Sequence, residues 1–70
     1  MFVQAEFTDW LVRVEAEYRE MPGLQLTEPQ MRRLWGFDGP TCAAIVQRLV
    51  SSGVLRKTPT QRYVLETAGR

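Results

Sequence analysis

Two helical segments of this chain are separated by a very short break, which constrains the fold more than any other feature. The first segment closes at Gly36, a residue type that is common just after helix ends. A new helix can start at once, because Asp38 is a favoured N-cap and Pro40 is tolerated in a first helical turn. A turn of about three residues makes the two helices cross steeply. The sequence therefore predicts a helix-turn-helix unit.

The first helix of this unit has a start signal and an apolar face. Thr27 and Gln30 fit a capping box, in which each side chain accepts a hydrogen bond from the other residue's backbone N–H. Pro29 suits the first turn, where no backbone donor is needed. Three apolar residues then recur at helical spacing, namely Met31, Leu34 and Trp35. We expect a helix over about 28–36 with these three side chains facing the core.

The second helix of the unit is expected over about 39–52, with Gly53 as its stop. Four apolar side chains share one of its faces, namely Cys42, Ile45, Val46 and Leu49. The tight turn before it is flanked by two aromatic residues, Trp35 and Phe37. We expect these aromatic residues to form the apolar wedge that fixes the crossing.

Helical periodicity also predicts a first helix over about 4–20, which Pro22 and Gly23 end. Its apolar stripe consists of Val3, Phe7, Trp10, Leu11, Val14 and Tyr18. Leu24 and Leu26 alternate with a polar residue and indicate a short strand at about 24–26. After Gly53 the period changes to two, which predicts a hairpin over about 54–65 with a loop of about four residues. Its expected inward positions are Leu55, Tyr63 and Leu65.

The chain of 70 residues is expected to form a single domain over 1–70, of mainly α (α+β) class. No apolar run reaches the length of a membrane span, and the start of the chain lacks the pattern of a signal peptide. One cysteine, Cys42, suits a reducing cytoplasm, and we expect it to be a small core residue. The chain has no histidine and no glycine-rich phosphate loop. We therefore expect no enzyme activity, no metal site, no cofactor and no small-molecule ligand.

Charge is distributed unevenly along a chain whose net charge is only +1. Residues 1–28 carry six acidic residues and two arginines, a net charge of −4. Residues 29–65 carry six basic residues and one acid, Asp38, a net charge of +5. Such asymmetry points to a polyanionic partner for the second part, although solubilising surface charge remains an alternative.

The order of elements is helix, short strand, helix, tight turn, helix and hairpin. Three segments carry a resemblance to the winged helix-turn-helix family, namely "LTEPQMRRLWGFD", "CAAIVQRLVSSGVLRK" and "RYVL". The resemblance covers residues 24–65 and implies a three-helix winged helix-turn-helix fold with a C-terminal β-hairpin wing. The wing tip, "TPTQ", departs from the family pattern because it lacks a glycine. In this family the helix after the turn enters the DNA major groove.

This resemblance implies double-stranded DNA as the partner and transcriptional regulation as the role. At 100° per residue, five residues of the third helix lie opposite its apolar face or at its leading edge: Thr41, Ala44, Gln47, Arg48 and Ser51. Gln47 suits adenine and Arg48 suits guanine, so we expect these two to read bases. Phosphate contacts are expected from Arg32, Arg33, Arg56, Lys57 and Arg62. The alternative is a winged-helix protein-interaction module that binds no DNA, which the thin charge on the third helix favours.

A second, thinner apolar stripe on the back of the first helix suggests self-association. It comprises Phe2, Ala5, Val12 and Ala16. Paired domains could read two half-sites, which is the usual way for a small domain to gain specificity. A helix end with scattered small residues explains the stripe equally well.

Overall fold

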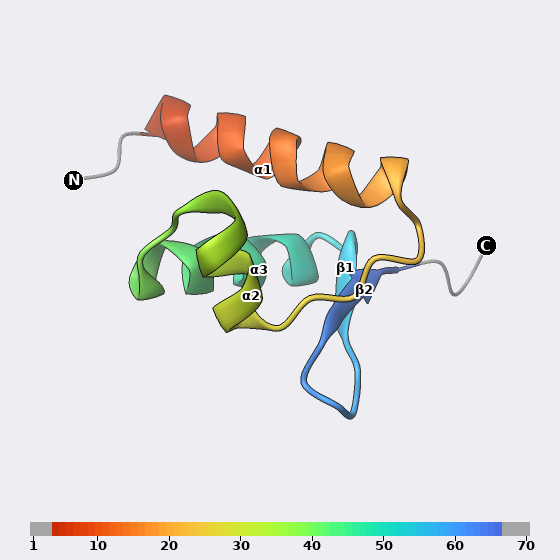
Figure 1. Ribbon diagram of the computed structural model, residues 1–70. Helices are drawn as coiled ribbons and strands as arrows, with labels where there is room; N and C mark the ends of the chain where they lie inside the picture. The colour runs from red at the N-terminus through yellow and green to blue at the C-terminus, as the bar shows by residue number, and fades with distance from the viewer. Residues whose placement is uncertain (1–3, 67–70) are drawn as a thin grey trace.

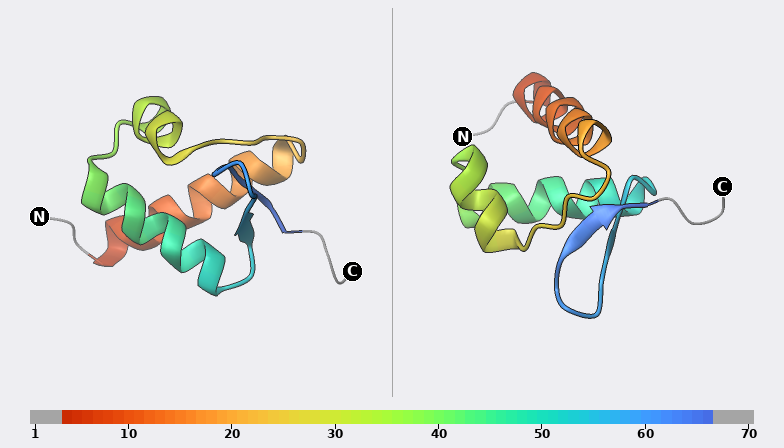
Figure 2. Two further views of the ribbon diagram at one scale, coloured as in Figure 1. Left: turned by 90° about the horizontal axis from the view of Figure 1, so that it is seen from below. Right: turned by 45° about the vertical axis from the view of Figure 1, so that its right-hand side comes forward.

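The computed structural model describes residues 4–66, and its architecture fits a helix-turn-helix with a β-hairpin wing (Figure 1). In chain order the elements are α1 (Gln4–Glu20), α2 (Glu28–Trp35), α3 (Gly39–Ser51), β1 (Leu55–Lys57) and β2 (Tyr63–Leu65). Helix α1 lies across one side of the α2–α3 pair and packs against α3 and β2. The hairpin extends beyond the helices, as Figure 2 shows.

The capping box predicted at the start of α2 is present. The Gln30 backbone N–H donates to Thr27 Oγ1 at 3.3 Å, and the Thr27 N–H donates to Gln30 Oε1 at 2.9 Å. At the other end of α2, Gly36 takes the left-handed conformation with φ 73°. Its N–H donates to the Arg32 carbonyl, which supplies one of the acceptor contacts that a helix end needs.

Asp38 caps α3, as predicted. The Thr41 backbone N–H donates to Asp38 Oδ1 at 2.8 Å. Phe37 lies between two tryptophan rings, 4.7 Å from Trp10 and 6.0 Å from Trp35, measured between ring centroids. The predicted pair of Trp35 and Phe37 therefore does lie together at the turn, and Trp10 of α1 completes the cluster. These contacts fix the α2–α3 turn against the first helix.

The core lies between α1, α3 and the hairpin. Its fully buried members are Val14, Tyr18, Met31, Cys42, Ile45, Val46, Leu49, Leu55 and Tyr63. Tyr18 adds a directional link, because its hydroxyl donates to the Tyr63 carbonyl oxygen at 2.8 Å. The same carbonyl accepts the Leu26 backbone N–H at 3.2 Å. One carbonyl therefore joins α1, the segment before α2 and the base of the hairpin.

The expected strand at 24–26 is reduced to a single antiparallel bridge between Leu26 and Tyr63. Leu26 exchanges both backbone hydrogen bonds with Tyr63, at 3.2 and 2.7 Å. The pairing stops there because Thr27 is already the N-cap of α2, and Leu24 donates its N–H back to Met21 instead. Helix α2 ends one residue earlier than predicted, at Trp35, and α3 ends at Ser51.

The prediction that Leu34 faces the core is wrong. Its side chain is 58% exposed, whereas Met31 is buried and Trp35 half-buried. At 100° per residue, Leu34 is rotated by 60° from Met31, on the side opposite Trp35. Because Met31 and Trp35 pack against the core, Leu34 is left at the outer edge of α2.

The hairpin has the expected inward residues, with Leu55 and Tyr63 buried and Leu65 half-buried against the core. Strand pairing aligns Leu55 with Leu65, Arg56 with Val64 and Lys57 with Tyr63. Residues 58–62 connect the strands, a loop of five rather than about four residues. Among residues 4–66, no helix is long and apolar enough to cross a membrane.

Candidate nucleic-acid interface

The outward face of α3 is uncovered and carries three small side chains and one glutamine. Ala43, Ala44, Gln47 and Ser51 are exposed. The apolar stripe opposite them is buried against the core, which fixes the rotation of the helix about its axis. Thirteen residues give a rod about 20 Å long. A rod with small outward side chains can enter a groove about 12 Å wide, the width of the DNA major groove.

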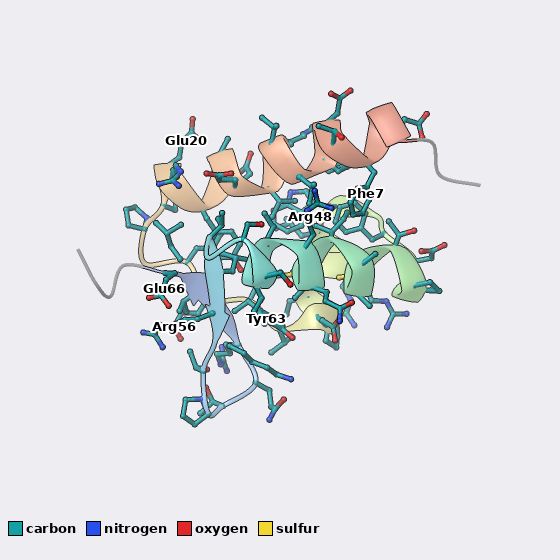
Figure 3. The ribbon with its side chains drawn as sticks, turned by 180° about the vertical axis from the view of Figure 1, so that it is seen from behind. Phe7, Glu20, Arg48, Arg56, Tyr63 and Glu66 are labelled. Atoms are coloured by element: carbon teal, nitrogen blue, oxygen red, sulfur yellow. The ribbon has the colours of Figure 1, made fainter. Side chains whose placement is uncertain are left out.

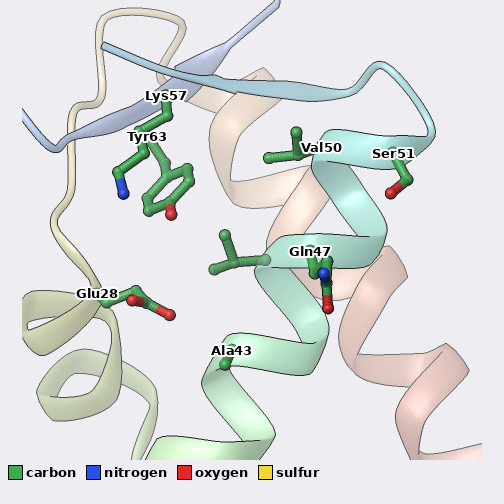
Figure 4. A pocket seen from close by; sticks show the side chains of 8 residues that line it. Glu28, Ala43, Gln47, Val50, Ser51, Lys57 and Tyr63 are labelled. Carbon is green, nitrogen blue, oxygen red and sulfur yellow. The ribbon is translucent and has the colours of Figure 1, made fainter. Parts of the chain in front are cut away.

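A groove of about 500 Å³ runs between α3, the hairpin and the start of α2 (Figure 4). Its lining comprises Glu28, Ala43, Val46, Gln47, Val50, Ser51, Lys57 and Tyr63. Val46 and Tyr63 are buried, and Figure 4 shows Val50 directed from α3 toward Tyr63, with Ser51 pointing away from it. Three elements far apart in sequence therefore contribute to one surface.

The two predicted base-reading residues lie on different sides of α3. Gln47 lines the groove beside the hairpin. Arg48 is one residue further on, a rotation of about 100°, and it points toward α1 in the direction of Phe7 (Figure 3). The sequence placed both on one face, but the structure brings only Gln47 next to the hairpin. Thr41 is half-buried on the same flank as Arg48, while Ala44 and Ser51 lie on the outward face.

The two basic residues of β1 point to opposite faces of the hairpin, because side chains alternate along a strand. Lys57 lines the groove, and its Nζ lies 5.7 Å from the centroid of the Tyr63 ring. Arg56 is on the other face, where its Nε lies 3.6 Å from Glu66 Oε1 (Figure 3). This exposed ion pair contributes little to stability, about 0–1 kcal/mol. It nevertheless offsets one of the positive charges expected to meet phosphate.

The wing tip turns without a glycine. Gln61 takes the left-handed conformation there, with φ 68°. Thr58 and Arg62 close the loop, because the Thr58 N–H donates to the Arg62 carbonyl at 2.7 Å and the Arg62 N–H donates to Thr58 Oγ1 at 3.2 Å. The side chain of Arg62 is exposed, so it is available to a phosphate beside the wing.

Arg32 and Arg33 together border a hollow of about 330 Å³ with Pro29 and Phe37, beside the α2–α3 turn. Arg32 lies beside the start of α3, where its Cζ approaches to 4.0 Å from the position that a Cβ on Gly39 would take. Arg33 also borders the hollow formed by Leu26, Gln30 and Leu34 on the outer side of α2.

Hydrogen bonds from Thr41 lower the pKa of Asp38, and Arg32 adds a smaller effect in the same direction.

Cys42 is buried, as expected for a small core residue. Burial raises the pKa of the Cys42 thiol to about 11, with a further contribution from Glu28. Its Sγ lies 3.8 Å from the Glu28 carbonyl oxygen, a weak hydrogen bond. At neutral pH the group is therefore a neutral thiol, the less nucleophilic form.

Sequence reasoning missed Glu28 as a member of this surface. The residue looked like part of a helix start, and no neighbouring residue in the sequence shows that the hairpin lies across from it.

On the proposed dimer face, Val12 and Ala16 are exposed, whereas Phe2 and Ala5 lie outside the residues whose side chains are described. Comparison of the chain with protein-family models, with curated proteins and with solved structures found no match.

Proposed function

We propose that this chain is a DNA-binding module, with α3 in the major groove and the hairpin wing on the phosphate backbone. The observation that carries the proposal is the exposed, small-residue face of α3 beside a projecting hairpin. Gln47 is the side chain best placed to contact a base edge, since an amide can bond adenine with both of its polar atoms. The role we propose is transcriptional regulation in the cytoplasm, a reducing compartment that suits the free Cys42 thiol.

Phosphate contacts come from several directions around α3 in this proposal. Lys57 and Arg62 supply the wing side, Arg32 the turn before α3, and Arg48 the flank next to α1. Such contacts on both sides of α3 would hold the helix in the DNA major groove without reading the base sequence. Arg33 shares a hollow with Arg32 and also borders the outer side of α2, so it would meet phosphate at the edge of this surface.

A second function is favoured by a different observation. Leu34 is 58% exposed and borders an apolar hollow of about 330 Å³ with Leu26 and Gln30. Leu26 and Leu34 border this hollow together with the polar Gln30 and Arg33, and an apolar patch with a polar rim is typical of a protein-contact surface. A protein-interaction module of the same fold would use this side of α2 rather than the outward face of α3.

A salt titration with duplex DNA tests the proposed function. If three to six basic residues meet phosphates, log K should fall with log salt at a slope of roughly −3 to −5, about −0.9 per contact. Fluorescence polarisation with a random duplex of about 20 base pairs measures this slope. Absence of binding at about 50 mM salt and tens of micromolar protein would contradict the proposal, since non-specific dissociation constants are typically 10⁻⁴–10⁻⁶ M.

The matched variants are Lys57→Gln and Arg19→Gln. Both remove one positive charge, but Arg19 lies on α1 and is ion-paired with Glu15 at 2.7 Å. Lys57→Gln should weaken binding to all duplexes and reduce the slope by about 0.9, whereas Arg19→Gln should leave the slope nearly unchanged. Equal effects of the two variants would show that the wing does not contact DNA.

A further inference from the structure

The groove between α3 and the hairpin contains a carboxylate as well as a lysine. Among its described lining residues, Glu28 is the acid and Lys57 is the base. Figure 4 shows the Glu28 side chain directed into the groove, on the wall that faces Gln47 and α3. In the described part of the chain the two charges form no ion pair, and Lys57 lies over the Tyr63 ring instead.

Capping of α2 does not require this carboxylate. Thr27 and Gln30 already exchange the two capping hydrogen bonds, and the backbone carbonyl of Glu28 is the atom that Cys42 contacts. An acid in a first helical turn is stabilised by the helix dipole, but a different acidic position in that turn would serve equally well. The rotation of α2 sets the direction of the Glu28 side chain, about 20° from that of Trp35, but neither this rotation nor capping requires an acid at the position.

A DNA strand held by Lys57 beside α3 would pass phosphates over this groove. The carboxylate of Glu28 would then face like charges across a few ångströms of water. Coulomb repulsion of that kind, partly screened by salt, corresponds to a loss of about three- to ten-fold in affinity. Since every phosphate carries the same charge, the loss is the same for every sequence.

We infer that Glu28 attenuates DNA binding uniformly and keeps the isolated domain weakly bound to random DNA. The inference rests on the proposed function, because it assigns a repulsive role to one residue of the same surface. Base contacts from Gln47 then account for a larger share of the total affinity at a preferred site. Because the loss is uniform, it lowers the affinity for every duplex and leaves the ratio between preferred and random duplexes unchanged.

The test compares Glu28→Gln with Glu20→Gln. Both variants remove one negative charge, but Glu20 is exposed at the end of α1 and points away from α3 (Figure 3). Polarisation titrations use a random duplex and a duplex selected by the wild-type protein from a randomised pool, at about 50 mM salt. Far-UV circular dichroism confirms that each variant is folded.

Glu28→Gln should strengthen binding to both duplexes by the same factor, about three- to ten-fold, and Glu20→Gln by less than two-fold. Equal effects of the two variants would overturn the inference and leave the proposed function standing. A changed ratio between the duplexes would also overturn it, because Glu28 would then read a base. If no duplex binds either the wild-type protein or Glu28→Gln, both the inference and the proposed function fail. If Glu28→Gln binds and the wild-type protein does not, the proposed function fails, and the inference, which rests on it, fails with it.

Discussion

Gln47 and Arg48 are adjacent in the sequence but serve different surfaces. Gln47 lies in the groove shared with Lys57, and Arg48 points toward α1. In a DNA complex this separation assigns them different partners. Gln47 can approach base edges from the outward face of α3. Arg48 lies closer to the DNA strand on the α1 side of the major groove. In the proposed complex, base reading and phosphate binding are thus assigned to neighbouring residues, about 100° apart around α3.

Alanine substitutions test this separation. Gln47→Ala should reduce discrimination at one or two base pairs by about 1–3 kcal/mol, the value of a bidentate base contact, with a small effect on random DNA. Arg48→Ala should weaken preferred and random duplexes alike and reduce the salt slope by about 0.9. Competition titrations with both duplexes measure the difference. Full retention of preference in Gln47→Ala would mean that α3 does not read sequence through this residue.

Asp38 gives the fold a pH dependence with a defined sign. Hydrogen bonds from Thr41 lower its pKa in the folded state below the unfolded value of about 3.9. Its contribution to stability is therefore complete above about pH 3.9 and is lost as pH falls through the lower folded-state pKa. Asp38→Asn keeps an N-cap acceptor but does not titrate.

Thermal unfolding of both proteins between pH 5 and pH 2 measures this contribution. The melting temperature of the wild-type protein should fall more steeply than that of Asp38→Asn, since the other carboxylates are common to both. Parallel curves over this range would show that the charge of Asp38 does not stabilise the cap.

The α2–α3 turn is the element on which the whole arrangement depends. Gly36 must take φ 73°, and Phe37 must reach the rings of Trp10 and Trp35. Because the turn is so short, a change at Gly36 propagates to the direction of α3. Gln61 in the wing turn takes a comparable conformation, with φ 68°, but this residue is exposed and lies outside the core.

Two glycine substitutions separate backbone conformation from packing. A Cβ at Gly36 or at Gly23 would meet no atom within 4 Å, but only Gly36 has a positive φ. Gly36→Ala should cost about 1 kcal/mol, the left-handed penalty less the gain from a stiffer unfolded chain, and lower the melting temperature by about 4–8 °C. Gly23→Ala should be neutral or slightly stabilising. Equal destabilisation of the two variants would indicate that strain at Gly36 is not the cause.

Local signals predicted the elements well, and long-range contacts explain what they missed. The capping box at Thr27 and the N-cap at Asp38 depend on neighbours in the chain, so the sequence places both. The exposure of Leu34 depends on which side of α2 the other helices cover. Likewise, the position of Glu28 in the groove depends on the hairpin pairing with Leu26, just before α2. The hydrogen bond from Tyr18 to Tyr63, which are 45 residues apart, lies beyond any local pattern.

At the scale of the whole molecule, the basic residues surround α3 instead of forming one patch. Lys57 is in the groove, Arg48 is on the α1 side, and Arg32 is beside the turn. Arg56 is paired with Glu66 on the far face of the hairpin. This distribution suits an extended polyanion that passes on both sides of α3 better than it suits a compact anion.

The central claim, that α3 and the wing form the DNA-binding surface, is tested most directly by NMR. Chemical-shift changes in the ¹⁵N-labelled protein on addition of a duplex map the contact residue by residue. The proposal predicts that the largest changes occur at Ala43, Ala44, Gln47, Ser51 and Lys57. Val12 and Ala16, on the outer face of α1, should be unaffected. Changes confined to α1 or to the Leu26–Leu34 side of α2, or no changes at about millimolar DNA, would contradict the account.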